Sequence, residues 1–78
     1  MPTVLRVGPY RFYFFASDRV EPPHIHVRRE KLVAKFWLDP VRVARSGRFS
    51  GHELNTIEQI VRENEQLIRE VWNDAFGT

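Results

Sequence analysis

The sequence predicts an α+β fold, in which an antiparallel sheet of four to five strands is packed on one face by a long C-terminal helix. Short segments rich in β-branched and aromatic residues, separated by turn residues, fill the first part of the chain. From Ser50 onward the apolar residues follow a helical period, and no proline occurs after Pro40. With 78 residues, the chain is expected to be a single domain over 1–78, with a β-rich half (1–49) and a helical half (50–78).

Turn residues divide the β-rich half into five predicted strands. Gly8-Pro9 interrupts the first, Pro22-Pro23 cannot donate two ladder hydrogen bonds, and Asp39-Pro40 ends the fourth. The stretch 17–23 is expected to be an irregular connection. The predicted strands are residues 3–7, 10–16, 24–29, 31–38 and, at an edge of the sheet, 41–45.

The helical half begins with a capping pattern. Ser50 is the expected N-cap, and Glu53 stands where its side chain could reach back to the Ser50 N–H. Gly77 is a plausible end. One helix of about 25 residues and two helices with a bend near the polar Asn64 are both compatible with the pattern. The apolar stripe consists of Leu54, Ile57, Ile60, Val61, Leu67, Ile68, Val71 and Trp72.

Charge is distributed unevenly behind a net value of +2. Residues 1–49 carry ten Lys or Arg and four Asp or Glu, whereas residues 50–78 carry two and six. Cysteine is absent, which excludes disulfides, a thiolate nucleophile and cysteine-ligated zinc. No apolar run approaches the roughly 18 residues of a membrane helix, and no signal-peptide pattern follows Met1. We therefore expect a cytoplasmic protein with no membrane partner and, because phosphate-binding glycine loops are missing, no cofactor.

Alternation along the strands predicts one apolar face toward the helix and one basic, aromatic face away from it. Cations interleaved with aromatic rings on an exposed sheet are typical of modules that bind single-stranded nucleic acid, because rings stack on bases while cations meet phosphates. The alternative is that the rings cover a protein interface, including that of a homodimer. The outward set contains Phe15, His24 and His26 together with the candidate nucleic-acid-binding or partner-binding residues Arg11, Tyr13, Arg28, Lys35 and Trp37.

His24 and His26 are one residue apart on a predicted strand, so both rings should point the same way. This spacing suits a catalytic acid–base pair, since histidine titrates near about pH 6.5. It also suits two ligands of one metal ion, although zinc needs three or four. A structural role for both rings, beside Pro22-Pro23, is the third interpretation. The residues that could complete a metal site are Asp18, Glu21, Glu30 and His52.

Several segments resemble a bacterial family known as domain of unknown function 4160, over essentially the whole chain. The most specific is the block Pro22-Pro23-His24-Ile25-His26-Val27. The others are Met1-Pro2-Thr3-Val4, the aromatic strand, Glu21, residues 35–41, Gly47-Arg48-Phe49, Glu53-Leu54 and Trp72. The resemblance implies a small bacterial protein encoded beside another small protein, an arrangement like that of a toxin–antitoxin pair. It carries over no catalytic residues to this chain and leaves the chemistry open.

Three functions follow as expectations. The first is a member of a toxin–antitoxin-like pair that contacts RNA or a cognate protein partner, encoded by a neighbouring gene, through the basic face. If this chain is a ribonuclease, His24 and His26 would be its general acid and base, and Arg28 or Lys35 would stabilise the phosphorane charge. The second is a non-enzymatic protein-binding or self-associating module. The third is a metal-binding module through His24 and His26.

Overall fold

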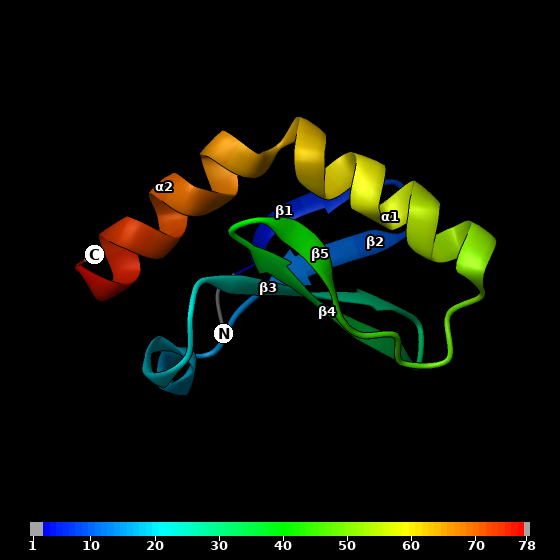
Figure 1. The fold of residues 1–78 in the computed structure, drawn as a ribbon, viewed down its shortest axis with the longest axis horizontal. Helices are drawn as coiled ribbons and strands as arrows, with labels where there is room; N and C mark the ends of the chain where they lie inside the picture. Colours follow the sequence, from blue (N-terminus) through cyan, green and yellow to red (C-terminus); the bar gives the residue numbers. More distant parts are fainter. Residues whose placement is uncertain (1–2, 78) are drawn as a thin grey trace.

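A computed structural model describes residues 3–77, which form a five-stranded antiparallel sheet with two helices on one face (Figure 1). The predicted α+β fold is confirmed. The opening Met1-Pro2 and the last residue of the expected domain, Thr78, lie outside the described residues. The strands are adjacent in chain order and comprise β1 (Thr3–Val7), β2 (Tyr10–Tyr13), β3 (His24–Arg29), β4 (Leu32–Leu38) and β5 (Val41–Arg45).

The core lies between the sheet and the helices α1 (Gly51–Glu63) and α2 (Glu65–Phe76). Alternate residues of β3 and β4 point into it, as the pattern predicted. Each helix contributes two buried residues four positions apart, and each gains most of its stability from this packing. The fully buried apolar side chains are Phe12, Ile25, Val27, Phe36, Leu38, Ile57, Val61 and Ile68.

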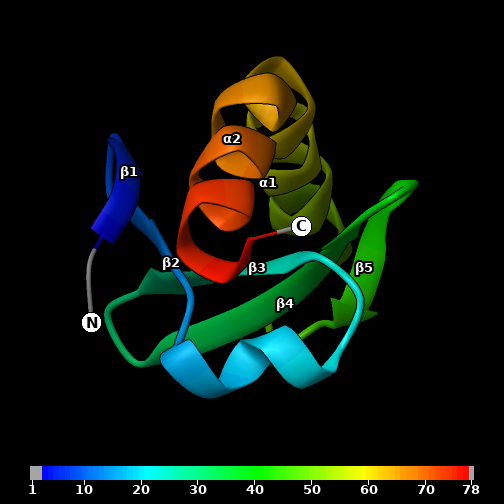
Figure 2. The ribbon, with the colours of Figure 1, turned by 90° about the vertical axis from the view of Figure 1, so that its left-hand side faces the viewer.

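The aromatic strand is shorter than predicted. It ends at Tyr13 instead of continuing to residue 16, because the Phe14 ring packs against Trp72 and Phe76 of α2, each 5.4 Å away between ring centroids. The chain then crosses to the other face of the sheet. There the short 3₁₀ helix η1 (Ala16–Val20) occupies part of the stretch that was expected to be irregular (Figure 2).

Asn64 separates the helical half into two helices, which settles the alternative left open by the sequence. Its backbone leaves the helical region (φ −117°, ψ 15°), and its side-chain Nδ2 donates to the carbonyl of Ile60 at 2.9 Å. The bend lets both helices follow the twisted sheet (Figure 1). Leu67, expected on the apolar stripe, is exposed because it lies about 100° around α2 from the buried Ile68.

The cap of α1 is only half the predicted capping box. The Glu53 backbone N–H donates to Ser50 Oγ at 3.1 Å, as expected. The Glu53 carboxylate does not reach back to Ser50, and that part of the prediction is wrong. It accepts instead from Arg29 Nη2 at 2.9 Å and from the Tyr10 hydroxyl at 2.8 Å, which joins α1 to the sheet. A guanidinium at this half-buried position needs a carboxylate as its partner.

The remaining ends and exposed surfaces follow the sequence pattern. Gly77 ends α2 in the left-handed region (φ 70°). The Glu58–Arg62 and Glu65–Arg69 pairs form on the exposed helix surface, and each arginine also donates to a carbonyl of the β4–β5 hairpin. Within residues 3–77, neither helix is long and apolar enough to cross a membrane.

Candidate functional site

The sheet face turned away from α1 and α2, here called the outer face, gathers most of the positive charge of the strands. Directly paired residues of neighbouring strands point to the same side, and the pairs Arg11–Arg28, Lys35–Arg45 and Trp37–Arg42 all lie on this face. The five strands contain no Asp or Glu. The outer-face cations are Arg6, Arg11, Arg28, Lys35, Arg42 and Arg45.

Intramolecular contacts hold several of these cations in place. The Arg11 guanidinium lies 4.9 Å from the Tyr13 ring centroid, and Arg28 Nε donates to the Glu30 carbonyl at 2.7 Å. Lys35 Nζ lies 4.7 Å from the Trp37 ring centroid and also pairs with Glu21. Arg42 and Arg45, on the exposed edge strand β5, form no ion pair with the residues that the structure describes. Together with Arg6, which is exposed on the other edge strand β1, they are the cations most available to an external anion.

One expected surface ring is not on the surface. Tyr13 is only 7% exposed, because its ring stacks on His26 (5.4 Å, 24° between planes) and meets the edge of the Phe15 ring. The prediction that Tyr13 is available on the exposed side is wrong. Trp37 remains partly accessible and Phe15 is 42% exposed, so these two rings are the aromatic surface that a ligand can meet.

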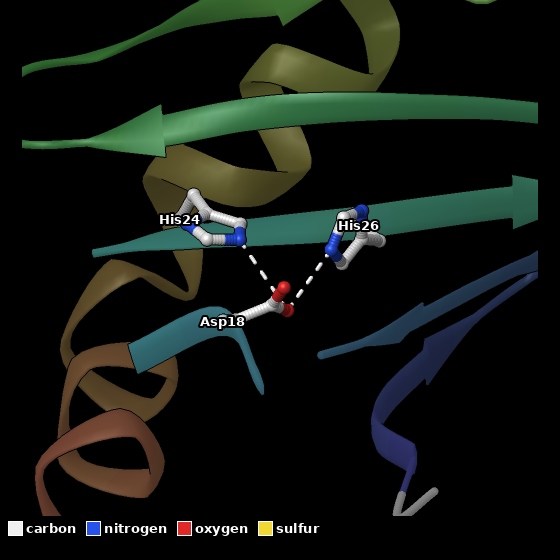
Figure 3. A group of neighbouring side chains, drawn as sticks. All are labelled: Asp18, His24 and His26. Atoms are coloured by element: carbon white, nitrogen blue, oxygen red, sulfur yellow. Dashed lines mark hydrogen bonds and ion pairs between the residues drawn. The ribbon is translucent and has the colours of Figure 1, made fainter. Parts of the chain in front are cut away.

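His24 and His26 point to the same side of β3, as predicted, and a carboxylate joins them (Figure 3). Asp18, from η1, places its Oδ2 atom 3.3 Å from His24 Nε2 and 3.0 Å from His26 Nε2. The two imidazole rings lie 5.2 Å apart, nearly perpendicular. A single oxygen therefore faces both histidines.

His24 is fully buried, which corrects the expectation that it faces solvent. Its ring is packed between Trp37 and Trp72, with centroids 5.8 and 5.2 Å away, and Asp18 of η1 lies against it from the outer face (Figure 3). Its Nδ1 atom lies 2.8 Å from the Pro22 carbonyl oxygen. Since a carbonyl can only accept, Nδ1 carries a proton and donates.

Asp18 is held as a carboxylate. Burial raises the pKa of Asp18. Two effects outweigh burial and lower the pKa below its ordinary value: the Phe15 N–H donates to Oδ2 at 2.7 Å, and His26 and His24 interact electrostatically with the carboxylate. Burial lowers the pKa of His26 despite the opposing effect of Asp18, so the neutral ring is favoured. Because the Asp18 carboxylate can only accept, His26 Nε2 donates to it at 3.0 Å, and this proton must leave Nε2 before that atom can bind a metal ion.

A pocket of about 450 Å³ opens beside this group, between η1 and strands β4 and β5. Asp18 and His26 form part of its wall, and His26 keeps 16% of its side chain exposed. Lys35 and Arg45 line the same pocket, along with Glu21. A ligand in the pocket could touch His26 but not the enclosed His24, so the two members of the expected acid–base pair differ in access.

A family model described as a domain of unknown function, DUF4160, matches residues 10–73. The chain belongs to this family. A search of curated proteins and a search of solved structures found no match.

The matched region of the DUF4160 family contains the whole of the histidine group and most of the outer face. Of the four residues considered as further ligands, the fold brings Asp18 to both histidines. Glu21 Oε1 lies 3.8 Å from His24 Nδ1 but is paired with Lys35. His52 and Glu30 are not in the group.

Sequence reasoning did not single out Asp18, because nothing in its spacing from His24 specifies a helical turn over the sheet. The available signal was local. The pattern of Phe15 and Asp18, in which the Asp18 side chain accepts the Phe15 N–H, marks the start of η1 and so fixes the carboxylate.

Proposed function

We propose that this chain is one member of a toxin–antitoxin-like pair and that its outer face binds single-stranded RNA. The observation that carries the RNA part is the charge separation on the sheet: six cations and no strand carboxylate on the outer face. The one strand cation that points to the helices, Arg29, is neutralised by Glu53. A surface of this kind attracts a polyanion at long range and meets its phosphates at short range.

The exposed aromatic rings favour single-stranded RNA over a duplex as the ligand. The partly exposed Trp37 and Phe15 lie next to the cations, and unpaired bases can stack on such rings whereas bases within a duplex cannot. The paired residues Lys35–Arg45 and Trp37–Arg42 lie side by side on β4 and β5, so a bound strand of RNA would meet cations and a ring at this edge of the outer face.

The binding proposal is tested with fluorescently labelled single-stranded RNA, by anisotropy at several salt concentrations. The double variant Arg42→Gln/Arg45→Gln should bind more weakly, and the slope of log K against log salt should fall by about 0.7 for each cation removed. The matched control is Asn55→Asp/Gln66→Glu, which lowers the net charge by the same amount on exposed helix surface. Equal weakening by both variants, or no RNA binding by the wild type, would contradict the proposal.

Membership of a pair rests on the family resemblance and is tested separately. The chain is expressed alone and together with the product of the neighbouring gene, and growth and complex formation are scored. Growth arrest by one gene that the other relieves supports the pair. If co-expression changes neither growth nor the purified species, the pairing is wrong whatever the outcome of the RNA experiment.

A protein partner is the second candidate, because a specific apolar surface favours it. Val20, at the end of η1, is 85% exposed and Phe15, just before η1, is 42% exposed. Both lie on the segment that covers the outer face, and contiguous exposed apolar surface marks interaction sites. Co-purification of a partner or a homodimer that Val20→Ser abolishes, without loss of RNA binding, would establish this use.

A further inference from the structure

We propose that Asp18, His24 and His26 bind a zinc-like divalent transition-metal ion with at least one coordination position open to the neighbouring pocket. This goes beyond RNA binding, because it concerns a different set of atoms, at the start of β3. The group combines two imidazoles and one carboxylate, a donor set found in open zinc sites and in non-haem iron sites.

The spacing of the ligand atoms fits such an ion. A tetrahedral Zn²⁺ holds nitrogen and oxygen ligands at about 2.0–2.2 Å, which separates any two of them by about 3.3–3.5 Å. Asp18 Oδ2 lies 3.3 Å from His24 Nε2 and 3.0 Å from His26 Nε2, and all three atoms lie within 4.8 Å of one another. Only small side-chain movements are needed to admit the ion.

An independent observation points to a missing cation. His24 Nε2 is buried and has no hydrogen-bond partner among the described residues, although Asp18 Oδ2 is its near neighbour. Because Nδ1 donates to the Pro22 carbonyl, a neutral His24 has its lone pair on Nε2, facing an anionic oxygen. Two electron-rich atoms at this distance repel each other, and either a proton on Nε2 or a metal ion between them would supply the positive charge that this contact needs.

The surroundings are those of a metal ligand set rather than of three isolated side chains. Metal-bound histidines usually donate their second ring nitrogen to a carbonyl or carboxylate, which fixes the tautomer, and the Pro22 carbonyl does this for His24. The Phe15 N–H fixes the Asp18 carboxylate in the same way. The donor set selects a zinc-like ion, because Ca²⁺ and Mg²⁺ prefer oxygen ligands alone.

The open position faces the pocket. Asp18 and His26 line it, so water or an anionic ligand can reach an ion held between them. Lys35 and Arg45, which line the same pocket, would attract the anion. Three protein ligands with a fourth position open to solvent is the arrangement of a catalytic rather than a structural zinc site.

Calorimetric titration of the full-length, tag-free, chelator-treated chain with ZnCl₂ tests the site. We expect one Zn²⁺ per chain, and visible absorption bands of a four- or five-coordinate ion when Co²⁺ is used. His24→Ala can fail to fold, so Asp18→Asn and His26→Gln are the decisive variants. Each should weaken Zn²⁺ binding at least about tenfold, since even outer-shell partners cost that much. His52→Ala, which removes an exposed histidine outside the group, should bind as the wild type does.

Two results would overturn the proposal. One is a folded wild type that takes up no Zn²⁺ or Co²⁺. The other is Zn²⁺ binding that Asp18→Asn and His26→Gln leave unchanged. Arg42→Gln/Arg45→Gln should retain Zn²⁺ binding, so a failure of the RNA proposal and a failure of this one are distinguishable.

Discussion

Asp18 Oδ2 and His24 Nε2 lie 3.3 Å apart, and this contact joins η1 to the first residue of β3. It places a carboxylate over the outer face at the one end where the sheet meets both α2 and η1. The same contact leaves a buried nitrogen without a hydrogen bond within residues 3–77. Buried polar groups are nearly always satisfied, so this exception needs an explanation, and the proposed metal ion supplies one.

The two histidines should differ in their contribution to stability. His24→Ala empties a fully buried position between two tryptophans and should cost about 2–4 kcal/mol of unfolding free energy in metal-free protein. His26→Ala, at a partly exposed position, should cost less than half as much. Urea denaturation measures both, with His52→Ala as the exposed control expected within about 0.5 kcal/mol of wild type. Equal losses for His24 and His26 would contradict the packing described here.

Glu53 should make stability depend on pH in the acid range. The hydrogen bond from Arg29, then that from Tyr10, lowers the pKa of Glu53 below its ordinary value of 4.5. A carboxyl with a lower pKa in the folded state stabilises the fold above its unfolded pKa, and this contribution is lost as pH falls through the folded value. The unfolding free energy of wild type should therefore exceed that of Glu53→Gln by a constant amount above about pH 5.5. This difference should shrink as the pH falls below 4.5, the ordinary pKa of the carboxyl.

Denaturation of both proteins between pH 7 and pH 3 measures this difference. Ser50→Ala is the control, because it removes the other half of the α1 cap and should cost about 1 kcal/mol at every pH. A difference between wild type and Glu53→Gln that stays level down to pH 3 would show that the Arg29–Glu53 pair does not carry the effect.

Gly47 should be intolerant of a side chain. It has a φ of 59°, and a Cβ there would lie 1.6 Å from the Val33 carbonyl oxygen of β4. Gly47→Ala should cost about 3 kcal/mol, from strain in the left-handed region and from displacement of the β4 backbone. Gly8 has a similar φ of 56° but open space around it, so Gly8→Ala should cost only about 1–2 kcal/mol. Similar losses at both positions would contradict the close approach of Gly47 to β4.

Local pattern was sufficient for most of the fold. The alternation of β3 and β4 and the turn residues between strands predicted their bounds to within one residue, because each strand has one face in the core. The helical period likewise predicted the buried stripe through Ile57, Val61, Ile68 and Trp72. The sequence does not specify the curvature of the sheet, which decides between one long helix and two helices with a bend near Asn64.

The candidate site was less accessible to sequence reasoning. The His24–His26 spacing indicated a shared side, but burial of His24 also depends on Trp72, which is distant in the sequence, and on the fold of the nearby η1 over the sheet. Strand propensity extended the aromatic run to residue 16, whereas Phe14 leaves the sheet to fill a space between α2 residues. After Phe14 the chain crosses to the outer face, where η1 brings Asp18, one of the four residues considered as further ligands, to both histidines.

The two tryptophans allow the most direct test of the outer face as the RNA-binding surface. Trp37 lies on that face beside Lys35, whereas Trp72 belongs to α2 and is buried in the core. In a ¹H–¹⁵N spectrum each indole N–H gives its own signal, and single-stranded RNA is added stepwise. We expect the Trp37 signal to move with saturation while the Trp72 signal moves far less. A saturable shift at Trp72 with Trp37 unmoved, or no shift at either, would contradict the account.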